Sequence, residues 1–234
     1  AISDKTRMFI GGFYRTGDSS RPGGVTAEDG GQLRANITRE LDNGYVRLSF
    51  KHLDDKTPMN MPVPVKTVNG TISEIAGIDP RKASFYSPYW VKDIVLDKNN
   101  NRVATNINDG LHVTNNAFGA EASLNLGGGW VLDEKFRKST NTGRFISIFP
   151  ADNGNAQKNM TYATGPNAGK AYTGAAFTAA VFNTSIDDAG STVNDLRVSN
   201  AFNTADGKFT VTGGLFTSLQ NVALTWNFNH YLLQ

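Results

Sequence analysis

Apolar and polar residues alternate through residues 30–55, and this alternation is the strongest structural pattern in the chain. From Leu33 to Leu41 the apolar residues occupy odd positions, and from Val46 to Phe50 they occupy even positions. A period of two is typical of a β-strand, whose successive side chains point to opposite faces. The polar side carries several charges and has to face water. The apolar side therefore has to meet a second sheet or lipid.

A tight turn is expected between these two strands. Asn43-Gly44 joins the two runs, and this pair readily adopts the positive φ angles of a two-residue hairpin turn. The predicted register places Asp42 opposite Tyr45. On the same register Glu40 lies opposite Arg47, Leu41 opposite Val46 and Ile37 opposite Phe50, which are chemically compatible cross-strand pairs.

Two further hairpins show the same pattern. One has its turn near residue 128, within a run of three glycines, and the other has its turn near residue 206. A further candidate strand, TRMFIGGFYR, precedes the first hairpin. We therefore expect seven strands, at residues 6–15, 30–41, 44–55, 117–126, 130–139, 194–204 and 207–219.

The connections between these strands are strongly asymmetric. Within each hairpin the connection is two to five residues, whereas residues 56–116 and 140–193 form connections of more than fifty residues. Short turns at one end and long loops at the other are typical of outer-membrane β-barrels. A tilted strand of about ten residues also spans the hydrocarbon layer. The predicted fold is an all-β antiparallel meander, a section of a transmembrane barrel with short periplasmic turns and long extracellular loops.

Composition narrows the possible functions. The chain has 234 residues, 23 of them basic and 21 acidic, and this balance gives no reason to expect a nucleic-acid partner. It contains no cysteine, which excludes disulfides and thiolate metal sites. No apolar run approaches the length of about 18 residues that a transmembrane helix needs.

Sequence patterns for catalysis or metal binding are missing. His52, His112 and His230 are far apart and do not have the spacing of a zinc site. The acidic and amide residues from Asp97 onward imitate a calcium loop, but Arg102 stands where that loop needs glycine. We interpret this stretch as a solvated turn and expect no enzyme activity, no metal and no cofactor.

The long connection 56–116 is a candidate ligand-binding loop. It combines aromatic rings, methionines and charges, which suit the capture of a sugar or an iron chelate by stacking and hydrogen bonding. The alternative is that these rings pack the loop against itself or contribute to an aromatic girdle at the membrane boundary. The candidate ligand-binding residues are Met59, Met61, Arg81, Phe85, Tyr86, Tyr89, Trp90 and Asp93.

The polar positions of the strands form a second candidate group. In a barrel they face the lumen, where they guide a polar ligand, hold an internal plug, or satisfy one another and water. The predicted lumen-facing residues are Arg34, Asn36, Glu40, Arg47, Lys51, Glu121 and Arg137, together with Ser49, Asp133, Lys135 and Arg197.

Three blocks of the chain, residues 30–65, 116–150 and 194–233, resemble the barrel of TonB-dependent outer-membrane receptors of Gram-negative bacteria. They look most like the branch found in sphingomonad and Caulobacter-like species. The first block begins GGQLRANITRELDNGYVRLSF, the second includes AEASLNLGGGWVLDEKFRKS, and the third includes NAFNTADGKFTVTGGLFTSLQ. All three are strand patterns, and none is catalytic.

The resemblance implies active uptake of a scarce ligand through a barrel of about 22 strands that is closed by a plug. The ligand would be a small molecule, either a ferric siderophore or another iron chelate, or an oligosaccharide or other nutrient. The other implied partners are outer-membrane lipid and TonB, which acts through a plug that residues 1–234 lack. We therefore expect an interior section of a partial receptor barrel in the outer membrane.

Two other functions are consistent with the same patterns. A soluble secreted β-sandwich that binds carbohydrate would bury the apolar rows between two sheets. A passive porin-like channel would use the barrel without a plug and would conduct ions steadily.

Overall fold

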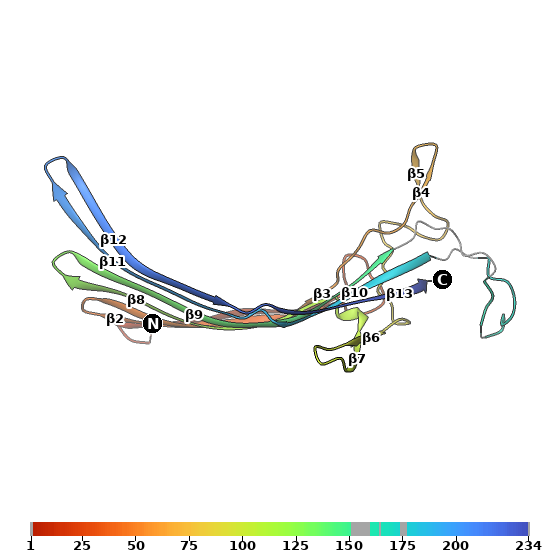
Figure 1. The fold of residues 1–234 in the computed structure, drawn as a ribbon, viewed down its shortest axis with the longest axis horizontal. Helices are drawn as coiled ribbons and strands as arrows, with labels where there is room; N and C mark the ends of the chain where they lie inside the picture. The colour runs from red at the N-terminus through yellow and green to blue at the C-terminus, as the bar shows by residue number, and fades with distance from the viewer. Residues whose placement is uncertain (1, 151–159, 164, 174–176, 234) are drawn as a thin grey trace.

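The computed structural model of the protein is a large curved antiparallel sheet with two small hairpins (Figure 1). The structure describes residues 2–150, 160–163, 165–173 and 177–233. The all-β prediction is confirmed, since the sheet contains nine strands and the described helical structure is the short 3-10 helix η1 (Ile107–Asp109).

The strands occupy seven positions across the sheet, in the predicted order. The first five are β1 (Thr6–Gly17), β2 (Glu28–Leu41), β3 (Gly44–Thr57), β8 (Leu111–Gly127) and β9 (Trp130–Pro150). The sixth position is shared by β10 (Phe177–Asp188) and β11 (Ser191–Thr204), and the seventh by β12 (Gly207–Gln220) and β13 (Ala223–Leu233).

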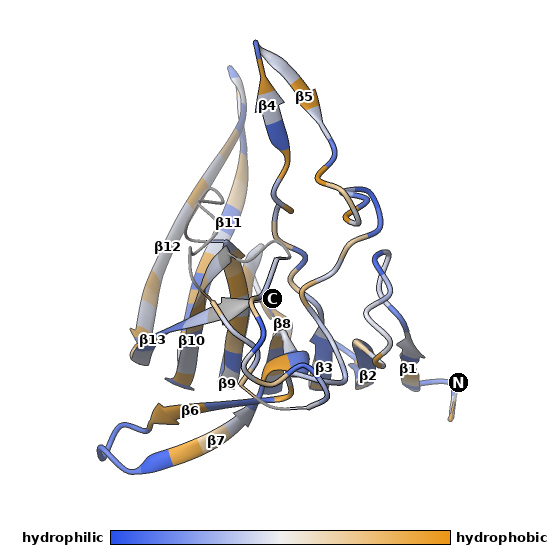
Figure 2. Ribbon diagram, turned by 90° about the vertical axis from the view of Figure 1, so that its right-hand side faces the viewer, coloured by the Kyte–Doolittle hydropathy of each residue, from blue (hydrophilic) through white to orange (hydrophobic). Residues whose placement is uncertain are grey.

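The antiparallel meander is confirmed, whereas a closed barrel is not formed. The strand ends in Figure 2 follow one another in an open row from β13 to β1. Among the described strands, β1 and the β12–β13 position do not pair with each other, so this part of the chain forms a sheet with two free edges.

No helix in the described part of the chain is long and apolar enough to cross a membrane.

The predicted register of the first hairpin is wrong. Leu41 pairs with Gly44, so the turn consists of Asp42 and Asn43 and lies one residue earlier than expected. Glu40 is opposite Tyr45, not Arg47. The same correction places Val46 opposite Arg39, Leu48 opposite Ile37 and Phe50 opposite Ala35. The division of the residues between the two faces is unchanged, because an odd residue still pairs with an even one.

Gly44 gives the physical reason for this difference. Its φ of 152° favours glycine, and a Cβ on this residue would lie 1.9 Å from the carbonyl oxygen of Ser123 in β8. The glycine is therefore needed where β3 meets its neighbour, and not inside the turn. The second turn lies near residue 128, as predicted; it consists of Gly128 and Gly129, whose φ angles are 57° and 83°, while Gly127 pairs with Trp130.

The long connection between β3 and β8 contains two hairpins that the sequence patterns did not predict. One consists of β4 (Lys66–Val68) and β5 (Thr71–Ser73), and the other consists of β6 (Lys92–Leu96) and β7 (Arg102–Asn106). The hairpins lie on opposite sides of the sheet, with β4–β5 on its concave side and β6–β7 on its convex side (Figures 1 and 2).

The sheet has one apolar face and one polar face at its short-turn end. Alternation and register place exposed large apolar side chains together on the first of these faces. We call this surface the apolar face; its members are Met8, Ile10, Leu33, Ile37, Leu41, Val46, Leu48, Phe50, Phe118, Phe202, Phe209, Val211, Leu215 and Leu219. We call the opposite surface of the same strands the polar face.

The buried core lies at the long-loop end. Ile146 and Ile148 of β9 pack with Val181 of β10 and Ile107 of η1, all almost fully buried. Both β9 isoleucines have the parity of the apolar face, because the β8–β9 and β9–β10 registers run without a shift through this region. The chain therefore covers this face with its own loop at one end of the sheet and leaves it bare at the other.

Replacing Gly44 by alanine should destabilise the sheet by about 2 kcal/mol or more, since strain at φ 152° adds to the clash with Ser123. Gly207 is a matched control: its φ is 135°, but a Cβ there meets nothing within 4 Å. We expect Gly207→Ala to cost about 1 kcal/mol. Urea unfolding followed by tryptophan fluorescence measures both values, and equal costs would contradict the close approach of β8.

Candidate functional site

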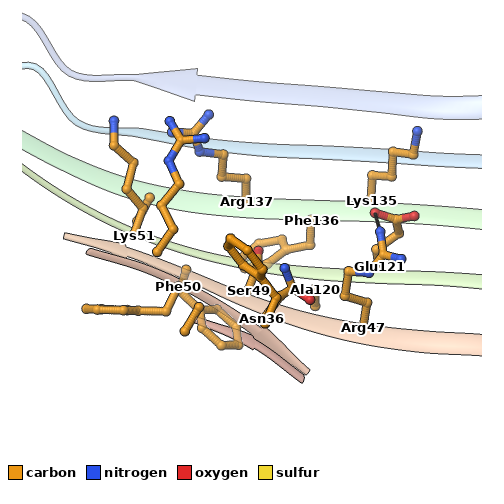
Figure 3. A pocket seen from close by; sticks show the side chains of 16 residues that line it. Asn36, Arg47, Ser49, Phe50, Lys51, Ala120, Glu121, Lys135, Phe136 and Arg137 are labelled. Carbon is orange, nitrogen blue, oxygen red and sulfur yellow. Dashed lines mark ion pairs between the residues drawn. The ribbon is translucent and has the colours of Figure 1, made fainter. Parts of the chain in front are cut away.

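The structure brings all the predicted lumen-facing residues onto the polar face. Cross-strand register places Arg34 beside Lys51 and Asn36 beside Ser49, and it continues from Arg47 through Glu121. Glu121 in turn pairs with Lys135, and Arg137 pairs with Gly119. Residues from four neighbouring strands thus form one charged surface, and Figure 3 shows the long side chains of Arg47, Lys51, Lys135 and Arg137 extending from the same side of the sheet.

Near the short turns several charges of this face are paired. Arg47 lies 3.7 Å from a carboxylate oxygen of Glu121, and its Nε donates to Thr38 at 2.9 Å. The Tyr45 hydroxyl also donates to Glu121. Similar pairs join Arg7 to Glu40 and Arg197 to Asp195. Arg7, Arg47 and Arg197 thus each have a carboxylate partner, and these pairs form a balanced network.

A cluster of three cations lies further from the turns, and we call Arg34, Lys51 and Arg137 the cation cluster. Lys51 is within electrostatic reach of both arginines. The three side chains line one shallow hollow of about 610 Å³ on the sheet. Within the described residues none of the three forms an ion pair, in contrast to the network beside them.

The predicted loop residues do not assemble into one site, and several of them support the fold. Tyr86 is 4% exposed, and its hydroxyl accepts a hydrogen bond from the backbone N–H of Met59 at 2.7 Å. Burial raises the pKa of this hydroxyl. Phe85 and Trp90 pack on the buried core, where the Trp90 ring meets Tyr231 edge to face at 4.8 Å.

Asp93 anchors the β6–β7 hairpin to the sheet. Its carboxylate is fully buried and accepts hydrogen bonds from Asn183 at 2.7 Å, from Asn229 at 2.6 Å and from the Tyr231 hydroxyl. Arg144 donates to the Oδ1 of the same Asn183 at 2.8 Å and places a compensating charge nearby. Because a buried carboxylate needs such donors, Asp93 fixes the position of the loop.

The remaining loop candidates lie elsewhere. Tyr89 is 96% exposed, and Arg81 is held at the surface by Asp79 with an Nε–Oδ1 distance of 3.0 Å. Met61 accepts a hydrogen bond from Arg21 through its backbone carbonyl. The self-packing interpretation of the loop therefore describes Phe85, Tyr86, Trp90 and Asp93, while Tyr89 is free to contact other molecules.

The Asp97 stretch is a turn between β6 and β7, as predicted. The Asp97 carboxylate accepts hydrogen bonds from the backbone N–H groups of Asn99 and Asn101. These bonds, that of Asn101 first, hold the pKa of Asp97 below its usual value. In the part of the chain that the structure describes, no group of three His, Cys, Asp or Glu side chains is arranged to hold a metal ion.

An aromatic cluster at the long-loop end was not predicted from the sequence. Phe182 contacts Phe149 at 4.4 Å and Phe228 at 4.7 Å, and Trp226 stacks on Phe228 at 5.9 Å. Register places these rings on the continuation of the polar face, and Trp226 is 60% exposed. The available signal was the alternation from Leu224 to His230, which lies beyond the last predicted strand.

No protein-family model matches the chain, and neither the curated proteins nor the solved structures include a significant match to it.

The burial of Tyr231 and its contact with Asp93 predict that its hydroxyl ionises at a higher pH than an ordinary tyrosine. Burial, assisted by the hydrogen bond to Asp93, raises the pKa of Tyr231 to about 12 from 10.0. A raised pKa means that the stabilisation by the neutral hydroxyl is complete below pH 10 and is lost as the pH rises towards 12. Ultraviolet absorbance of the phenolate and fluorescence of neighbouring Trp90 should report this step. Tyr231→Phe should remove it, and an unchanged titration would contradict the assignment.

Proposed function

We propose that the protein is a barrel section of a TonB-dependent outer-membrane receptor that takes up a scarce ligand, either a ferric siderophore or another iron chelate, or a carbohydrate or other nutrient. The polar face would line the lumen and the long connections would lie outside the cell. Uptake would depend on TonB acting through a plug, and the barrel section itself would perform no covalent chemistry. The support comes from the apolar face, its boundary and the arrangement of the loops.

The bare apolar face is the observation that carries this proposal. Its side chains remain exposed on several neighbouring strands, and monomeric water-soluble proteins rarely expose a continuous apolar surface of this size. In β2 this surface extends from Leu33 to Leu41 and in β12 from Phe209 to Leu219. These lengths of nine to eleven residues match a tilted strand that crosses the hydrocarbon layer.

The apolar face ends at a sharp polar boundary. In β3 the same side of the strand changes from Val46, Leu48 and Phe50 to His52, Asp54 and Lys56. His52 bonds to Asn116 at 2.7 Å, and Asp54 bonds to His112 at 2.7 Å. Polar side chains that satisfy each other outside an apolar band are suited to the transition from lipid to water, with the long loops beyond it.

The β-sandwich alternative lacks a second layer in the described residues. The apolar face of a sandwich is covered by another sheet, yet the other two sheets described here are the small β4–β5 and β6–β7 hairpins. The porin alternative shares the apolar face with the receptor, and ion conductance distinguishes the two.

Cysteine labelling tests the proposal directly, because the chain has no native cysteine. Single cysteines in place of Ile37 and Leu48 should be protected from a water-soluble maleimide in outer-membrane preparations and should react with a lipid-soluble one. Cysteines in place of Asn36 and Ser49, one residue away, should show the reverse pattern. The Tyr89→Cys variant should react on intact cells, because that position is exposed in the long loop. If the water-soluble reagent labelled the cysteines on the apolar face and those on the polar face equally, the result would contradict a membrane-spanning sheet.

A further inference from the structure

We infer that the cation cluster of Arg34, Lys51 and Arg137 is a binding site for a small molecule with two or more negative charges, such as carboxylates or phosphates. The inference deepens the proposed function and rests on it in one respect, that the polar face is a lumen through which ligands pass. It narrows the ligand class from any scarce nutrient to a polyanionic one.

The distribution of partners on the polar face carries this inference. On the short-turn side of the cluster, Arg47 forms an ion pair with Glu121. On the long-loop side, Arg15 forms an ion pair with Asp55 at an Nη2–Oδ2 distance of 2.7 Å. The three cations of the cluster lie between these two ion pairs, and none of them forms an ion pair with any described residue. Like charges on adjacent strands repel, so holding them together costs free energy unless an anion joins them.

The place and shape of the cluster favour a small molecule. Lys51 immediately precedes His52, the residue at which the apolar face gives way to polar side chains. The cluster therefore lies just inside the long-loop end of the proposed lumen. The hollow of about 610 Å³ lies within the usual range of small-molecule sites. Arginine side chains add planar forks that bind carboxylates and phosphates through two hydrogen bonds.

The charges next to the cluster differ on its two sides, so an entering anion meets them in a fixed order. A polyanion that enters from the long loops passes the paired Arg15 and Asp55, then meets the unpaired cations, and then reaches the balanced network around Glu121. Carboxylates in that network repel the anion, so it is held at the cluster until the rest of the transporter changes its conformation.

The test measures binding of pyranine, a fluorescent dye with three sulfonates, to the detergent-solubilised protein by fluorescence anisotropy. Arg34→Gln, Lys51→Gln and Arg137→Gln should each weaken binding about fivefold to tenfold. The matched control is Arg197→Gln, which removes a cation of the same face that lies outside the hollow and already pairs with Asp195 at 2.7 Å; it should change the affinity less than about twofold. Raising sodium chloride should weaken the wild-type complex.

Each outcome decides the inference. Failure of the wild-type protein to bind pyranine, or equal losses in the cluster variants and Arg197→Gln, would overturn it. Binding of a polyglutamate peptide without binding of pyranine would also overturn it and would assign the cations to an acidic protein segment. The cysteine labelling separates the two proposals. If cysteines on both faces are labelled equally but pyranine binding still depends on the cluster, the transport role is contradicted and the anion site is retained.

Discussion

Strand β9 holds the sheet together, because it pairs with β8 along one side and with β11 and then β10 along the other. Its 21 residues run from the short turn to the long-loop end without a break. The register of β9 therefore decides which residues share a face at both ends of the molecule. The charged surface, the bare apolar surface and the buried core all depend on this one strand.

A one-residue register shift beside β9 changes which residues of the sixth strand position belong to each face. Odd residues of β11, such as Arg197, share a face with Asp133, whereas in β10 it is the even residue Phe182 that lies opposite Ser147. Asn141 supports this irregularity through hydrogen bonds with the backbone of Ala189. The shift turns Asn183 and Val181 toward the β6–β7 hairpin and turns aromatic rings toward the polar face. A small irregularity thus separates a charged region from an aromatic one.

The sequence was sufficient to predict seven strands because alternation is a local signal, but β10, inside the expected long connection 140–193, and β13 were not predicted. The seven predicted strands, their order and the three short turns all appear, and the polar row falls on one face as its parity required. The register of the first hairpin was not predictable from Asn43-Gly44 alone. Gly44 is constrained by Ser123, about eighty residues away in the sequence, and a contact of that kind leaves no local pattern.

The loop residues failed as a joint site for a similar physical reason. Aromatic and acidic residues in a loop are equally suited to contact a ligand and to contact the body of the protein. Asp93 and Trp90 found partners in Asn229 and Tyr231, which lie more than a hundred residues later. Only the fold reveals such partners, so the sequence could identify the candidates but could not divide them between the two roles.

The same consideration makes the charged residues of the polar face more informative than the loop aromatics. A buried ring or carboxylate is explained once its packing partners are known, as Tyr86 and Asp93 are. A cation is different, because the sheet offers many carboxylates and pairs Arg47 and Arg15 with them. Strand pairing places Lys51 beside Arg34, and neither forms an ion pair with a described residue, so internal stability does not account for the arrangement. The free energy that this repulsion costs is recovered when a negatively charged group binds, which makes an anion the natural complement of this surface.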